Sequence, residues 1–128
     1  MDYIKKTYDF LKSKNFELTQ KEMSEFFGDY YDIFSNTSLQ LRFSSSRSYQ
    51  TIDIRCNKPG ENWFDLALVK ALLYNEKILD KVTVIEEYCN FLQKEIYHIL
   101  KLFEHEKYPI VKKRLEELEI ERVKQMFS

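Results

Sequence analysis

Histidine and cysteine are the side chains best suited to metal binding or nucleophilic catalysis, and the chain has two of each. His98 and His105 are seven residues apart, which places them on one side of a helix, with Glu104 and Glu106 nearby. A zinc motif needs more closely spaced ligands, as in His-Glu-x-x-His. We therefore expect solvated or half-buried histidines and no metal site.

Cys56 and Cys89 lie far apart and form no Cys-x-x-Cys pattern. A disulfide scaffold needs denser cysteine in a secreted chain. A catalytic thiol needs a histidine or a helix N-terminus beside it, whereas Cys89 lies well inside a predicted helix. Two reduced thiols, one in a strand and one in a helix, are the simplest interpretation.

The remaining chemical motifs are serine runs, glycine loops and paired carboxylates. The serine-rich run 44–48 lacks a Gly-x-Ser-x-Gly elbow, and the two glycines, Gly28 and Gly60, lie in no phosphate-binding loop. Acidic residues gather around the predicted sheet, and each has an ordinary role in a turn, on a strand or at a helix start: Asp29, Asp32, Asp53, Glu61 and Asp65. We expect no catalytic residue and no cofactor, and keep a small Asp/Glu or His hydrolase as an alternative.

The composition narrows the class of protein. The chain has 128 residues, of which 44% are hydrophobic and 32% charged, and this suits a single domain over residues 1–128. The formal net charge is −1, and no segment forms a basic block of the kind that nucleic-acid binders show. No apolar signal core is visible, and no apolar run approaches the ~20 residues that span a bilayer. We expect a cytoplasmic protein that contacts neither nucleic acid nor membrane.

The elements that must position these residues change in type along the chain. Residues 2–14 have helical periodicity, and the capping-box pattern Thr19–Glu22 predicts a second short helix with Met23, Phe26 and Phe27 that ends at Gly28. Residues 30–34, 39–43 and 49–56 predict three strands, the last two with clear alternation. Leu39, Leu41, Phe43, Ile52, Ile54 and Cys56 should then face the core.

The C-terminal half is predicted to be helical. Asn62 could cap a third helix with Trp63, Leu66 and Leu73 near one face, and Thr83–Glu86 predicts a fourth helix that runs to about Glu106. Pro109 favours the first turn of a final, polar and peripheral helix. The predicted fold class is α+β, with a three-stranded antiparallel β-meander and about five helices, two N-terminal and three C-terminal.

The outer side of the meander is the predicted contact surface for a partner protein. Tyrosine and arginine are the residues that protein interfaces favour. Alternation places Arg42, Asp53 and Arg55 on the face away from the core, with Arg47 at the hairpin turn. The candidate partner-binding residues are Tyr30, Asp32, Arg42, Arg47, Tyr49, Asp53 and Arg55.

The chain resembles small bacterial immunity proteins, which neutralise polymorphic or contact-dependent toxins. The resemblance lies in Gly28-Asp-Tyr-Tyr, Leu39-Gln-Leu-Arg-Phe, Arg47, Thr51-Ile-Asp-Ile-Arg55, Trp63-Phe-Asp-Leu66 and the charged helix from Leu115 to Phe127. It implies a non-enzymatic protein that holds a toxin domain in a tight complex. Immunity proteins that face nucleases are often strongly acidic, so the net charge of −1 does not favour a nuclease partner.

Two alternatives to toxin immunity stay open at this point. A phage or mobile-element accessory protein that inhibits a host defence factor would use the same surface. A small hydrolase would instead show a cleft lined by Asp53, Asp65 or His98. The sequence does not determine the oligomeric state.

Overall fold

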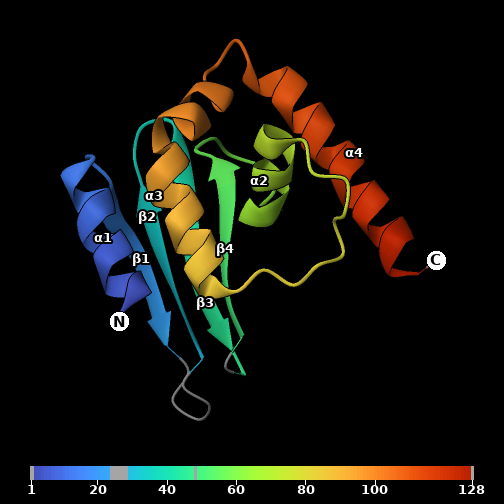
Figure 1. The fold of residues 1–128 in the computed structure, drawn as a ribbon. Helices are drawn as coiled ribbons and strands as arrows, with labels where there is room; N and C mark the ends of the chain where they lie inside the picture. Colours follow the sequence, from blue (N-terminus) through green and yellow to red (C-terminus); the bar gives the residue numbers. More distant parts are fainter. Residues whose placement is uncertain (1, 24–28, 48, 128) are drawn as a thin grey trace.

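A computed structural model describes residues 2–23, 29–47 and 49–127, and it shows an α+β protein, as predicted (Figure 1). One N-terminal helix precedes a five-stranded antiparallel sheet, and three helices follow it. The elements are α1 Tyr3–Ser13, β1 Glu17–Met23, β2 Tyr30–Ser35, β3 Leu39–Ser46, β4 Tyr49–Cys56, β5 Phe64–Asp65, α2 Leu66–Tyr74, α3 Ile85–Leu102 and α4 Tyr108–Met126. None of the helices in the described residues is both long and apolar enough to cross a membrane.

The sheet is a meander in which the strands lie side by side in chain order, from β1 to β5. The turn between β2 and β3 is closed by Asn36, whose side-chain oxygen accepts hydrogen bonds from the backbone N–H groups of Ser38 and Leu39, each at 2.8 Å. Arg47 has a φ of 51° after the end of β3. The predicted alternation is confirmed, because the six core-facing residues of β3 and β4 are all buried: Leu39, Leu41, Phe43, Ile52, Ile54 and Cys56.

The hydrophobic core lies between one face of the sheet and the helices, and we call this the covered face. The helices α1 and α3 pack against each other, and α3 also contacts β4. The ring of Tyr8 lies 4.6 Å from that of Phe34 and 4.9 Å from that of Phe43. On the other side of β3 and β4, alternate residues are only half-buried. We call this other side, with Gln40, Arg42, Asp53, Arg55 and Trp63, the open face.

The predicted second helix is wrong. Residues Glu17–Met23 form β1, which pairs along its length with β2 and is exposed at every position. The capping-box pattern at Thr19–Glu22 therefore lies in a strand. Pairing with β2 outweighs the weak local preference of these residues for a helix start. Phe26, Phe27 and Gly28 lie outside the described residues. The N-terminal region therefore holds one helix, and the sheet gains a strand beyond the predicted three.

The start of the third predicted helix also needs correction. The helix begins at Leu66 and is capped by Asp65, whose carboxylate accepts a hydrogen bond from the Ala67 N–H at 2.9 Å. Asn62 is not its cap. The preceding pair, Phe64–Asp65, forms the fifth strand. Trp63 therefore lies outside the helix on which it was predicted.

The last two helices differ from prediction mainly at their ends. The helix α3 begins after Val84, which makes no side-chain cap bond, and it ends at Leu102 instead of near Glu106. Pro109 occupies the first turn of α4, as predicted. The final helix is less peripheral than expected, because Leu115 is fully buried in the main core and α4 packs on α2.

Candidate functional site

The open face is built by the period-two alternation of β3 and β4. Arg42 pairs directly with Asp53, and Gln40 pairs with Arg55. Residues that pair directly in an antiparallel sheet point to the same side, so these four side chains form two adjacent rows. They lie opposite the buried residues of the same strands.

Trp63 lies over this face, and the sequence analysis did not identify it as a surface residue. Phe64 pairs with Ile54 on the covered face, so the preceding residue projects to the open face. The guanidinium carbons of Arg42 and Arg55 lie 4.5 Å and 4.2 Å from the Trp63 ring centre. Both distances are within the range of a cation–π interaction. The only tryptophan of the chain is therefore held by two arginines.

A chain of hydrogen bonds fixes the guanidinium of Arg55. Its Nε donates to the Gln40 side-chain oxygen at 2.6 Å, and the Gln40 amide nitrogen donates to the Ser35 hydroxyl at 3.0 Å. The Ser35 hydroxyl lies 2.7 Å from that of Thr19. These bonds run from β4 to β1, so they fix the positions of the polar groups of the open face.

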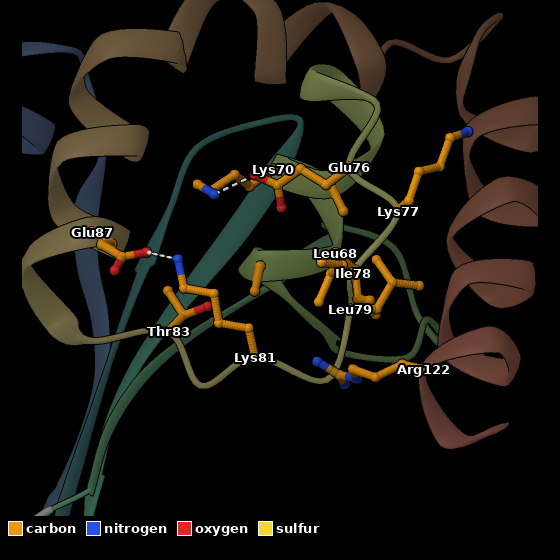
Figure 2. Close-up of a pocket in the computed structure, with 12 residues that line it drawn as sticks. Leu68, Lys70, Glu76, Lys77, Ile78, Leu79, Lys81, Thr83, Glu87 and Arg122 are labelled. Atoms are coloured by element: carbon orange, nitrogen blue, oxygen red, sulfur yellow. Dashed lines mark hydrogen bonds and ion pairs between the residues drawn. The ribbon is translucent and has the colours of Figure 1, made fainter. Parts of the chain in front are cut away.

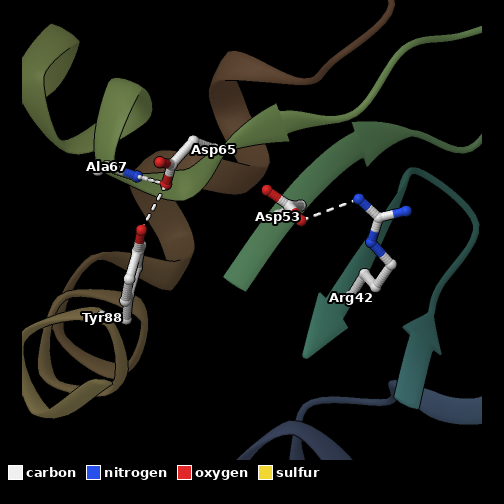
Figure 3. Close-up of polar contacts among 5 residues, drawn as sticks. All are labelled: Arg42, Asp53, Asp65, Ala67 and Tyr88. Atoms are coloured by element: carbon white, nitrogen blue, oxygen red, sulfur yellow. Dashed lines mark hydrogen bonds and ion pairs between the residues drawn. The ribbon is translucent and has the colours of Figure 1, made fainter. Parts of the chain in front are cut away.

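Asp53 is the acidic member of the open face. Its carboxylate accepts a hydrogen bond from Arg42 Nη2 at 2.9 Å, and Asp65 pairs opposite it on β5 (Figure 3). Burial raises the pKa of Asp53 above its ordinary value, Arg42 opposes this effect, and the negative charge of Asp65 adds to it. A carboxyl group with a raised pKa beside a second carboxylate is the feature that a hydrolase would require.

Asp65 is occupied by structural contacts. In addition to the backbone N–H of Ala67, its carboxylate accepts a hydrogen bond from the Tyr88 hydroxyl at 2.7 Å (Figure 3). It also accepts one from Arg122 Nη1 at 2.9 Å. Burial and the neighbouring Asp65 raise the pKa of Tyr88 well above its ordinary range. Asp65 thereby joins β5 to α2, α3 and α4. Asp53 and Asp65 each form an ion pair with an arginine, Asp53 with Arg42 and Asp65 with Arg122.

The other predicted surface residues at the hairpin turn are exposed but lie away from the Trp63 cluster. Tyr49 is 68% exposed at the start of β4. The backbone N–H of Arg47 donates to the Asp29 carboxylate at 3.0 Å. The structure thus brings together Arg42, Asp53 and Arg55, and it places Arg47 and Tyr49 at the tip of the same sheet.

Two of the predicted partner-binding residues lie on the covered face. Asp32 is 5% exposed and pairs with Phe43, and its carboxylate accepts a hydrogen bond from the Tyr8 hydroxyl at 2.6 Å. Tyr30 shares the covered face because it is two residues before Asp32 on β2. The inclusion of Asp32 among accessible contact residues is therefore wrong, since the helices bury it. The signal that could have shown this is the spacing of Asp32 and the apolar Phe34, because residues two apart in a strand lie on the same face.

The histidines and cysteines lie elsewhere. His98 is 3.1 Å from Glu95 on α3, and His105 is 3.1 Å from Lys58. Burial raises the thiol pKa of both Cys56 and Cys89, which disfavours the nucleophilic thiolate. No group of three or more His, Cys, Asp or Glu side chains in residues 2–23, 29–47 and 49–127 is arranged to hold a metal ion.

Comparisons with protein families, with curated proteins and with solved structures found no match for this chain.

Proposed function

We propose that this protein is a non-catalytic binding protein of the cytoplasm that neutralises a toxin domain by direct contact, as immunity proteins do. The observation that carries the proposal is the cluster of Trp63, Arg42 and Arg55 on a sheet face where alternate residues of β3 and β4 are only half-buried.

The residue types of this cluster support a protein partner. Tryptophan and arginine are enriched among the residues that dominate binding free energy at protein interfaces. The guanidinium of Arg55 is in contact with the Trp63 ring, so one partner surface can cover both side chains. A central aromatic side chain surrounded by polar groups matches the usual anatomy of such interfaces.

The rigidity of the cluster supports tight binding. The ion pair of Arg42 with Asp53 and the bond of Arg55 with Gln40 hold both guanidinium groups in place. Side chains that are already ordered lose less conformational entropy on association. A smaller part of the favourable interaction energy is then lost to ordering the surface.

The charge of the face favours a protein over a nucleic acid. The charge of Arg42 is balanced by Asp53 at 2.9 Å, and β1 adds the acidic Glu17 and Glu22 at the edge of the same sheet. Phosphate backbones are bound by surfaces with an excess of lysine and arginine. A mixed face of this kind suits a partner with complementary charges of both signs.

The test is protection in a cell that produces the toxin candidate. The protein encoded beside this chain's gene is expressed alone and together with this chain, and growth and complex formation are measured. We expect growth arrest that this chain relieves, and a stable complex between the two purified proteins. Trp63→Ala should weaken the complex by about 2 kcal/mol or more, which is roughly 30-fold in Kd.

The controls separate loss of contact from loss of fold. Trp63→Ala should lower the free energy of unfolding by only about 1 kcal/mol, because a half-exposed cation–π contact contributes little. Tyr97→Ala removes a 62% exposed aromatic side chain on α3 and should leave protection intact. Arg55→Glu should abolish protection, whereas Arg114→Glu on α4 should not. If the two single variants Trp63→Ala and Arg55→Glu both protect as well as the wild-type protein, the open face is not the binding surface.

A further inference from the structure

A cavity of about 360 Å³ lies away from the open face, between α2, the segment 75–84 and the start of α3 (Figure 2). Asn75 ends α2 in a left-handed conformation, with a φ of 53°, and the chain then turns back. The side chain of Gln125 on α4 holds the returning segment. Its oxygen accepts from the Leu79 N–H at 2.8 Å, and its nitrogen donates to the Lys77 carbonyl at 2.9 Å. The cavity wall is thus fixed to α4.

Cationic side chains from three parts of the chain surround this cavity. Lys70 comes from α2, Lys81 from the returning segment and Arg122 from α4 (Figure 2). Lys77 also contributes to the lining, although its side chain extends away from the centre of the view. The lining holds four cationic and two acidic side chains, whereas the whole chain has a net charge of −1. The lining thus carries more cationic than acidic side chains, although Arg122 is also paired with Asp65, which lies outside the lining.

The cations keep donor capacity beyond their present ion pairs. Arg122 uses Nη1 for Asp65, and a guanidinium has five N–H donors. Lys70 contacts Glu76, and Lys81 lies 3.9 Å from Glu87 with its side chain 67% exposed. An ammonium group has three donors and can contact a second anion. A ligand could thus be bound without first breaking every pair.

The floor of the cavity is apolar. Leu68 is 1% exposed, Ala71 3% and Leu79 8%, and all three line the cavity. Small-molecule sites typically combine such an apolar floor with a few polar groups that fix orientation, in volumes of roughly 300–1,000 Å³.

We propose that this cavity binds a small organic anion, with a phosphate or carboxylate held by Lys70, Lys81 and Arg122 and an apolar body placed against Leu68, Ala71 and Leu79. The hydroxyl of Thr83, which also lines the cavity, adds a further hydrogen-bond donor. Charge-assisted hydrogen bonds from arginine and lysine are the strong contacts to such anions. The site is independent of the proposed partner contact at the open face, so either proposal can fail alone.

The test is a titration of the intact protein with phenyl phosphate and with benzoate, followed by calorimetry and by backbone amide chemical shifts. We expect saturable binding of at least one probe below about 10 mM. The shifts should be confined to α2, the segment 75–84 and the parts of α3 and α4 around Glu87 and Arg122. Inorganic phosphate lacks the apolar body and phenol lacks the anion, so both should bind at least about tenfold more weakly. Affinity should fall as salt is raised, because the recognition is electrostatic.

Variants decide whether the cations are responsible. Lys81→Glu reverses an exposed charge at the cavity and should weaken binding about tenfold. Lys5→Glu makes the same change on α1, which lies on the far side of α3 from α2, and should leave the affinity unchanged (Figure 1). If Lys81→Glu unfolds the protein, Lys81→Gln is used, with a smaller loss expected. The absence of saturable binding by the wild-type protein, or equal losses in the Lys81 and Lys5 variants, would overturn the proposal.

Discussion

The two faces of the sheet each combine an aromatic side chain with a carboxylate, but in opposite ways. On the covered face, Phe34 is fully buried, and the Asp32 carboxylate has one oxygen bonded to Tyr8 and one buried oxygen without a hydrogen-bond partner. On the open face, Trp63 is half-buried, and the Asp53 carboxylate is paired with Arg42. The covered face packs aromatic rings together, and the open face packs a ring against cations.

This difference separates folding from recognition. Burial of apolar surface stabilises the fold in proportion to the area removed from water, so the covered face should dominate the free energy of unfolding. The contacts of the open face are partly hydrated and contribute less to stability. A surface whose contacts matter little for folding can change its residues to suit a partner.

The largest expected effect comes from Phe34→Ala on the covered face. Phe34 is fully buried and packs against Tyr8 and Phe43, so its removal leaves a cavity in the core. We expect a loss of about 3–5 kcal/mol in the free energy of unfolding, measured by chemical denaturation. Phe127→Ala is the matched control, because that ring is 82% exposed, and it should change stability by no more than about 0.5 kcal/mol. Similar losses in the two variants would contradict the assignment of the core.

Sequence patterns predicted those parts of the fold in which one face is apolar. The alternation of Leu39, Leu41 and Phe43 on β3 has a period of two, and burial in the structure follows it. The strand β1 could not be recognised this way, because all its residues are exposed and no apolar periodicity exists to be seen. Its conformation is set by pairing with β2, which is a tertiary effect.

The candidate site was predicted only in part for a related reason. Arg42, Asp53 and Arg55 follow from strand alternation, and the structure brings them together. The position of Trp63 does not follow from alternation, because β5 has only two residues and is too short to show a period. The apolar residues after β5 have helical spacing, and they led to the prediction that Trp63 lies on a helix. Contacts across strands, such as that of Trp63 with Arg42, depend on registers that local patterns do not encode.

A smaller effect is expected from Tyr8→Phe, which tests the polar contact within the covered face. The variant keeps the ring but removes the hydroxyl that donates to Asp32 at 2.6 Å. Asp32 also lies 3.9 Å from the ammonium group of Lys21, whose side chain is largely exposed. An unsatisfied buried acceptor costs about 1–3 kcal/mol, and we expect a loss of that size in the free energy of unfolding.

The control for this change is Tyr97→Phe. Its hydroxyl accepts a hydrogen bond from Lys14 at 2.9 Å in an exposed position, so the same atom is removed where water can replace it. Denaturation curves should show a change within about 0.5 kcal/mol. If Tyr8→Phe were equally mild, the Asp32 carboxylate would have to be satisfied by another group.

The smallest effect concerns Asp53 on the open face and appears in the pH dependence of stability. Burial raises the pKa of Asp53 in the folded protein above the ordinary value of 3.8, so the folded state holds the proton more tightly than the unfolded chain does. The contribution of Asp53 to stability should therefore increase as the pH falls from neutrality through the raised pKa, and should level off below 3.8. Asp53→Asn does not titrate, so the wild-type free energy of unfolding minus that of the variant should rise over the same interval. A difference that falls as the pH is lowered would show that the ion pair with Arg42 outweighs burial, and that the open face contributes electrostatic stability of its own.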